Sequence, residues 1–233
     1  NYSGSFTTSA ASSAFTSLWT PASAPQQSVD NTPYGSVELG VKFYSEVDGY
    51  ITGIRFYKVA GSLGTHVGNL WSSSGQLLAS ATFTAESATG WQQANFAGPV
   101  AVEADIIYIA SYFAPSGFIV ADQDYFNGSG VNSYPLHAPA SQFAGGNGVY
   151  SYNSSSTFPN QSWGSTNYWV DAVFISAPSV VSVTPAADAT GVSTSASILI
   201  TFDRDMDAAT INSSTIVLTD SGGNQISATV SYN

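Results

Sequence analysis

Short apolar or alternating runs, each closed by turn-forming residues, recur along most of the chain. Alternation of this kind predicts β-strands, and no stretch repeats apolar residues at helical spacing over about three turns. The runs that predict strands in the first part of the chain cover residues 37–43, 50–57, 69–72, 76–84, 91–96, 100–102, 106–113, 118–121 and 168–175. Strands that recur so often favour an all-β fold, an antiparallel jelly-roll-like β-sandwich with fewer than about a tenth of its residues in helices.

The composition changes after Ala177-Pro178, where a new set of short strands begins. These strands are expected at 180–184, 197–202, 215–219 and 226–230. They supply about four of the roughly seven strands that an immunoglobulin-like sandwich needs. The sequence therefore predicts a linker or upstream strand at 1–17, a β-sandwich at 18–177 and an incomplete immunoglobulin-like β-domain at 178–233.

Between Asp122 and Thr166 the alternation weakens, and Gly, Asn, Ser and Pro dominate. An irregular segment of this length inside a compact domain is usually functional or held by other means. We therefore expect ligand-binding residues to collect in this segment.

Five stretches of the first part resemble a bacterial family of large secreted and surface proteins that is known only as a domain of unknown function. The stretches are Val37–Phe43, Gly53–Lys58, Gly64–Trp71, Gly90–Gln92 and Asn167–Asp171. Their order and spacing make the resemblance specific over about residues 18–175. It implies a β-sandwich accessory module, with carbohydrate binding as the expected role although the family has no assigned function.

The second part is similar to the bacterial immunoglobulin-like domain of surface-layer and adhesin proteins. The residues that carry this similarity are Val183-Thr184-Pro185, Gly191-Val192, Ile200–Asp203 and Met206-Asp207. The pairing of the two domain types is typical of multi-domain surface chains. It implies an extracellular or cell-surface location.

The small number of positively charged residues limits the kinds of molecule that the protein can bind. Only 8% of the residues are charged, and four Lys or Arg against fifteen Asp or Glu give a formal net charge of −11. So few cations cannot neutralise phosphates, which excludes nucleic acid and anionic membranes as partners. The absence of cysteine excludes disulfides, thiol catalysis and Cys-ligated zinc. Because no apolar run reaches the roughly 18 residues of a membrane span, we expect no membrane insertion.

The residues that catalysis requires are mostly missing. His66 and His137 are the only candidates for a general base of unshifted pKa near neutral pH, and no Gly-x-Ser-x-Gly elbow is present. Asp122 and Asp124 are the closest pair of carboxylates for a glycosidase, but such a pair more often marks a solvated strand end. We therefore predict no catalytic residues and no enzyme.

Calcium binding suits the carboxylates better than catalysis does, because a calcium ion takes six to eight oxygen ligands. Glu38 lies in the first strong strand and Asp171 in the last strand of the sandwich. If these strands pair, as the first and last strands of jelly rolls commonly do, the two acids converge on one structural calcium ion. This arrangement resembles the calcium site of several carbohydrate-binding jelly rolls. The alternative is that each acid ends a strand or pairs with Lys42 or Arg55.

A second calcium pattern, Asp203-x-Asp205-x-Asp207, is incomplete. It lacks the glycine at the sixth position and the acid at the twelfth that a calcium loop needs. Met206–Thr210 is therefore expected to form a short helical turn between strands.

Aromatic residues make up 13% of the chain and suit sugar recognition, in which exposed rings contact the C–H faces of pyranoses. Many lie in the irregular segment beside amides and carboxylates, and some of these should only fix the backbone. Trp71 and Trp169 follow strand patterns and are expected in the core. The predicted ligand-binding residues are His66, Trp91, Asp122, Asp124, Tyr125, Tyr150, Tyr152 and Trp163.

The sequence therefore predicts a non-catalytic extracellular binding module for a polysaccharide or cell-surface glycan. The alternative is a structural component of a stalk, sheath or filament. In that case the partner is a neighbouring surface-protein chain, which could complete the second domain by adding a strand.

Overall fold

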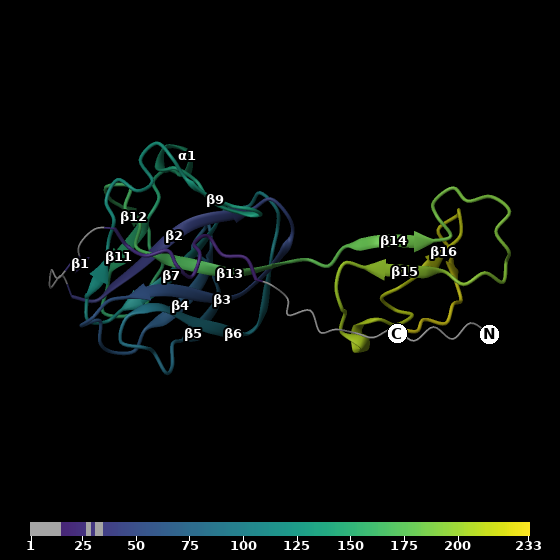
Figure 1. The fold of residues 1–233 in the computed structure, drawn as a ribbon, viewed down its shortest axis with the longest axis horizontal. Helices are drawn as coiled ribbons and strands as arrows, with labels where there is room; N and C mark the ends of the chain where they lie inside the picture. The colour runs from purple at the N-terminus through teal and green to yellow at the C-terminus, as the bar shows by residue number, and fades with distance from the viewer. Residues whose placement is uncertain (1–14, 27–28, 31–34) are drawn as a thin grey trace. The chain divides into compact units, whose positions relative to one another are not determined.

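The structure, a computed structural model, describes residues 15–26, 29–30 and 35–233. The chain divides between Ala177 and Pro178 into two compact units (Figure 1). The predicted segment 1–17 falls mostly outside the described residues, and its last three residues belong to the first unit.

The first unit, Phe15–Ala177, consists of strands and one short helix. In chain order they are β1 (Val29–Asp30), β2 (Val37–Ser45), β3 (Gly49–Lys58), β4 (Val67–Ser72), β5 (Leu77–Thr82), β6 (Gly90–Val102), β7 (Tyr108–Ala114), β8 (Ile119–Val120), β9 (Val131–Ser133), β10 (Leu136–Ala138), α1 (Ser141–Ala144), β11 (Val149–Tyr152), β12 (Gln161–Ser162) and β13 (Val170–Ser176). The prediction of an all-β antiparallel fold is confirmed, because strands make up 42% of the chain and helices 3%.

Two sheets form the sandwich. The larger, 8-stranded sheet has the order β12-β11-β2-β7-β4-β5, with β10 also paired to β2 and β9 to β10. The 3-stranded sheet has the order β13-β3-β6. All these pairs are antiparallel. Because β2 is long enough to pair with β11 near its start and with β10 at its end, it brings distant parts of the chain together.

Alternation along the strands builds the core between the sheets. Val37, Leu39 and Phe43 of β2 point inward. Glu38, which lies between Val37 and Leu39, points to the opposite face of the sheet. Phe56 of the smaller sheet stacks on Tyr112 of the larger sheet, with ring centroids 4.3 Å apart. Both rings are almost fully buried in one apolar cluster, so the two sheets share a single core.

Each sheet also has a covered outer face. Residues 18–26 lie over the outer face of the 3-stranded sheet, and Thr16 forms an antiparallel bridge with Phe174 at the edge strand β13. Residues 153–160 lie over the outer face of the larger sheet, where Phe158 packs on Trp71. Side chains that point away from the core are therefore buried as well.

Two predicted boundaries differ from the structure. β6 runs as one strand through Gly98-Pro99, where two strands were predicted. A register shift between Ile51 and Gly53 of its partner strand accommodates this stretch. The segment 122–166, predicted to be irregular, contains β9 to β12 and α1. Its strands are two to four residues long and largely polar, so their alternation is too short to predict a sheet.

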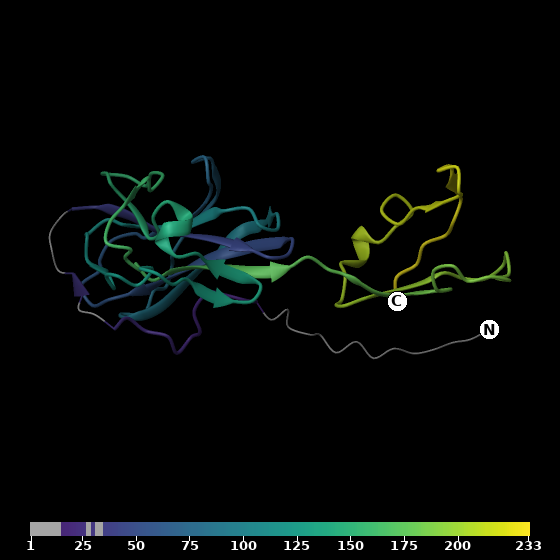
Figure 2. The same ribbon diagram turned by 90° about the horizontal axis from the view of Figure 1, so that it is seen from above.

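The helix α1 stands on the outside of the first unit, as Figure 2 shows from above. It contains four residues and none of them is buried. In the described part of the chain, no helix has the length and apolarity that a membrane crossing demands.

The second unit contains two separate two-stranded sheets, β14 (Val180–Thr184) with β15 (Leu199–Phe202), and β16 (Leu218–Thr219) with β17 (Gln225–Ile226). A short helical turn, η1 (Ala208–Thr210), confirms the prediction for this segment, and Ala209 N–H donates to Asp207 Oδ1. None of residues 178–233, all of which the structure describes, is buried.

Candidate functional site

An aromatic groove of about 260 Å³ opens where the start of β2, β11 and two loops meet. Its lining residues come from the early part of β2, the segment 117–123, β11 and the loop after β12. They are Gly35, Val37, Leu39, Gly117, Ile119, Ala121, Gln123, Tyr150, Tyr152, Trp163, Thr166 and Tyr168. None of these residues carries an ionisable acid, a histidine or a cation, so the described wall of the groove is uncharged at neutral pH.

Three of the predicted ligand-binding residues meet in this groove. Tyr150 and Tyr152 point to the same side of β11 because they are two residues apart on a strand. Their ring centroids lie 5.4 Å apart at 64°. Tyr152 is 51% exposed and Trp163 is 57% exposed. These exposed rings provide surface for a flat, partly apolar ligand.

The loop that carries Trp163 is held in a strained conformation. Ser165 and Trp169 have φ angles of 49° and 53°, in the left-handed region that non-glycine residues seldom adopt. Asp124 N–H donates to Gly164 O (2.8 Å), and Phe126 N–H donates to Ser165 O (2.9 Å). Strain of this kind persists only where the surroundings fix the backbone, and it is concentrated at ligand sites. The loop therefore presents Trp163 from a rigid support.

Three other predicted ligand residues, Trp91, Asp122 and Tyr125, meet elsewhere, in a cluster with Trp19 and Trp169. The rings of Trp19 and Trp91 stack with centroids 6.4 Å apart. Asp122 is 2% exposed, and its Oδ2 accepts from Trp169 Nε1 and from the backbone N–H of Gln26. The Trp19 indole donates to the Tyr125 hydroxyl (3.0 Å). These contacts attach residues 15–26 to the sheet, so the cluster has a packing role.

Asp124 lies apart from both groups of predicted residues. It is exposed on a turn with φ 59°, a left-handed conformation that Asp tolerates better than most residues. Its backbone, through the bond to Gly164, has a clear role, whereas no hydrogen bond of its side chain is described.

The predicted convergence of Glu38 and Asp171 on one calcium ion is wrong. β2 and β13 belong to different sheets, because β13 pairs with β3 and not with β2. Glu38 faces residues 153–160 and Asp171 faces residues 15–26, on opposite outer faces. In the part of the chain that the structure describes, no three acidic or histidine side chains cluster as metal ligands.

Asp171 instead pairs with Arg55 across the strands, with 2.7 Å between Oδ2 and Nη2. The backbone N–H groups of Leu18 and Trp19 also donate to its carboxylate. Burial raises the pKa of Asp171, and the nearby Arg55 guanidinium opposes that rise. The Arg55 guanidinium lies 4.6 Å from the Trp91 ring centroid, a cation–π contact. For Asp171, the structure therefore shows the alternative to calcium binding, an ion pair with Arg55.

Glu38 forms a buried polar network under residues 153–160. Its Oε1 accepts hydrogen bonds from Asn69 Nδ2 (2.9 Å) and from the Ser111 hydroxyl. Its Oε2 accepts from the Ser156 hydroxyl (2.8 Å). Burial raises the pKa of Glu38, and these hydrogen bonds lower it by a smaller amount. Because residues 153–160 connect Tyr152 to β12 and Trp163, this network fixes the segment beside the aromatic groove.

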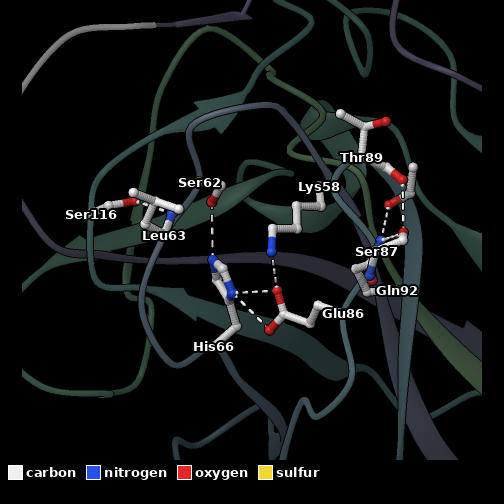
Figure 3. Close-up of polar contacts among 10 residues, drawn as sticks. Lys58, Ser62, Leu63, His66, Glu86, Ser87, Thr89, Gln92 and Ser116 are labelled. Carbon is white, nitrogen blue, oxygen red and sulfur yellow. Dashed lines mark hydrogen bonds and ion pairs between the residues drawn. The ribbon is translucent and has the colours of Figure 1, made fainter.

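His66 lies between Ser62 and Glu86 in the geometry of a nucleophile–base–acid triad (Figure 3). The Ser62 hydroxyl is 2.9 Å from His66 Nε2, and His66 Nδ1 is 2.9 Å from Glu86 Oε1. Burial lowers the pKa of His66, and the hydrogen bond to Glu86 opposes this. A carboxylate can only accept, so the neutral ring carries its proton on Nδ1 and accepts at Nε2 from Ser62.

This triad lacks access to a substrate. Ser62 is 2% exposed and does not line the aromatic groove. A serine nucleophile also needs backbone N–H groups that are free to bind the oxyanion of the transition state. Here the N–H of Ser62 donates to Val59 O and the N–H of Leu63 donates to Ser116 Oγ, so neither is free for that role. Lys58 Nζ lies 2.6 Å from Glu86 Oε2. The prediction that His66 contacts a ligand therefore gains no geometric support, and the group fixes the loop between β3 and β4.

Of the polar and aromatic residues that line the groove, sequence reasoning missed three, Gln123, Thr166 and Tyr168. Gln123 lies between Asp122 and Asp124, which were the predicted ligand residues there, and Tyr168 was predicted to begin a strand. The only sequence signal for the three residues is that they lie at the ends of the 122–166 segment or just beyond it.

Comparison with known proteins identifies two domains. Residues 22–170 match the family described as Domain of unknown function (DUF4082), and residues 175–233 match the Bacterial Ig-like domain. No curated protein matches the chain.

Proposed function

The chain belongs to the DUF4082 family, with a bacterial Ig-like domain after it, and we propose that its first unit is a non-catalytic module that binds a neutral glycan in the aromatic groove. Domains of these two kinds are typical of non-catalytic modules, and bacterial Ig-like domains are commonly extracellular or on the cell surface. The proposal extends these general properties to a ligand class and a site.

The observation that carries the proposal is the exposure of Tyr152 and Trp163 on an uncharged, rigidly supported wall. Pyranose rings stack their C–H faces on such aromatic surfaces, while amides and hydroxyls bond their hydroxyl groups. Gln123 supplies an amide at the groove, whereas the buried Thr166 hydroxyl donates to Trp163 O and supports the loop. The net charge of −11 disfavours acidic sugars, and the groove offers amino sugars no carboxylate.

Replacing Trp163 or Tyr152 with alanine should weaken glycan binding. Each stacked ring contributes about 1 kcal/mol, roughly a fivefold change in Kd. Because both rings are more than half exposed, the melting temperature should change little. Isothermal titration with neutral hexasaccharides of glucose, mannose and xylose, and with oligogalacturonate as the acidic comparison, measures the effect.

Leu63→Ala is a matched control, because Leu63 is 70% exposed and lies outside the groove. Equal loss of binding in this variant would contradict the assignment of the groove. A lowered melting temperature in the Trp163 and Tyr152 variants, with no glycan bound by the unmodified protein, would instead favour the structural alternative.

The non-catalytic part of the proposal has its own test at Ser62. A fluorophosphonate probe, which phosphonylates activated serines with loss of fluoride, should leave Ser62 unmodified in the folded protein because the hydroxyl is buried. Mass spectrometry of the digested protein detects the adduct. Labelling of Ser62 that disappears in His66→Ala would overturn the non-catalytic reading.

A further inference from the structure

A second hollow, larger than the aromatic groove, lies beside α1. Its volume is about 530 Å³, and its lining residues are Tyr44, Asp105, Ile107, Gly128, Ser129, Gly130, Asn132, His137, Ala138, Pro139, Ala140 and Phe143. The two cavities share no residue. Val37 of the groove and Tyr44 of this α1-side hollow lie seven residues apart on β2, about 23 Å along a strand.

Phe143 is the most exposed large apolar side chain of this unit, at 79%. Its exposure does not come from a loose backbone. The N–H of Ser141 donates to Phe126 O (3.0 Å), and Lys42 Nζ donates to Ala144 O (2.7 Å). Gly146 N–H also returns to Ser141 O. The ring of Phe143 is therefore held in water by a fixed support, and it lines the hollow.

Tyr44, Asn132 and His137 form an aromatic and polar part of the wall. The rings of Tyr44 and His137 stack with centroids 5.0 Å apart at 18°. His137 Nδ1 lies 2.7 Å from Asn132 Oδ1, and Glu46 Oε1 lies 2.9 Å from His137 Nε2. Contacts at both ring nitrogens fix the orientation of the imidazole. The wall is therefore prearranged without a ligand.

Asp105 places a carboxylate at the hollow from a strained backbone. Its φ is 60°, and its N–H donates to Ser45 O (2.7 Å). No lysine or arginine lines the hollow, so no described side chain there neutralises this carboxylate as an ion pair. A carboxylate, an amide and exposed rings that converge on one cavity are the groups that bind the hydroxyls and the C–H face of a sugar.

We propose that the α1-side hollow is a second saccharide site, with Phe143 as its stacking ring and Asp105 as its hydroxyl acceptor. The choice of ligand class rests on the proposed function of the aromatic groove. The hollow differs from the groove in its carboxylate, so it accepts amino sugars as well as neutral sugars. One unit with two sites some 20 Å apart binds a long polysaccharide more tightly than a short one, because the second contact becomes intramolecular.

Isothermal titration with neutral trisaccharides and with a glucosamine trisaccharide, each too short to reach both sites at once, tests the proposal through stoichiometry. The unmodified protein should bind two molecules per chain across this set. Phe143→Ala should weaken the second binding event about fivefold or more, as the loss of a stacked ring does elsewhere. Asp105→Asn should have a similar effect, and asparagine tolerates the left-handed conformation at this position. Leu63→Ala serves again as the control.

The variants separate the two sites. If only one molecule binds, and Trp163→Ala but not Phe143→Ala weakens it, the second site is overturned and the proposed function stands. If only one molecule binds, and Phe143→Ala but not Trp163→Ala weakens it, the groove assignment fails and the hollow is the saccharide site. If no saccharide binds, both assignments are overturned.

Discussion

Replacing Asp171 with alanine should destabilise the first unit by about 3–5 kcal/mol, the usual cost of removing one partner of a buried ion pair. The change leaves the Arg55 guanidinium, which is 4% exposed, without its carboxylate. It also removes the acceptor for the backbone N–H groups of Leu18 and Trp19. Urea unfolding followed by tryptophan fluorescence measures the loss.

Two variants make this result interpretable. Glu103→Ala removes an exposed acid and should cost little. The double change Arg55→Met with Asp171→Leu removes both charges, and it should cost less than Asp171→Ala alone because no buried charge is left unpaired. If Asp171→Ala cost less than about 1 kcal/mol, the ion pair would have no greater effect than a surface pair.

Replacing Glu38 with alanine should cost about 3 kcal/mol or more, because the buried donors of Asn69 and Ser111 lose their acceptor at about 1–3 kcal/mol each. The Ser156 hydroxyl also loses its acceptor, which releases residues 153–160 beside the aromatic groove. Glycan binding should therefore weaken together with stability. Chemical denaturation and titration of the same variant measure both effects. Unchanged binding in a destabilised variant would separate the network from the groove.

The change of the free energy of unfolding with pH shows whether Glu38 is charged or neutral in the folded protein. Burial raises its pKa above the unfolded value, so the folded state holds this proton at a pH where the unfolded state has released it. Stability from this group is therefore present near pH 4.5 and is lost as the pH rises through the folded pKa. His66 acts in the opposite direction, because its lowered pKa costs stability as the pH falls below about 6.5.

Glu38→Gln isolates the contribution of Glu38, since glutamine has nearly the same shape and does not titrate. The difference in free energy of unfolding between the unmodified protein and this variant should shift in favour of the unmodified protein as the pH falls from 7 to 5. Denaturant titrations at several pH values measure this slope. A difference that is constant with pH would contradict a raised pKa for Glu38.

The long strands were predictable from the sequence because their alternation is uninterrupted. β2, β3, β7 and β13 lie close to the predicted runs, and Trp71 and Trp169 are buried as expected. The short strands β9 to β12 were not predictable, because pairing with β2 and with each other creates them. Local composition says little about a strand that exists through a distant partner.

The dependence on distant partners also explains which of the predicted site residues lie together in the structure. Tyr150, Tyr152 and Trp163 are near one another in sequence, so one segment brings them together. Glu38 and Asp171 are more than a hundred residues apart, and their predicted meeting depended on a strand pairing that the chain does not form. Trp91 and Tyr125 are partly buried beside Trp19, whose placement over the sheet could not be anticipated from a Ser- and Ala-rich segment.

The bridge between Thr16 and Phe174 also determines how the first unit would respond to tension. The two strands are antiparallel neighbours, so the chain enters before Thr16 and leaves after Phe174 at the same end of the pair. A pull through both flanking segments opens such a pair one hydrogen bond at a time, as a zipper, instead of loading all bonds together in shear. The first bonds to break are the two backbone hydrogen bonds between Thr16 and Phe174. In a chain under tension, they would open before the load reached Leu18 and Trp19, which belong to the buried core.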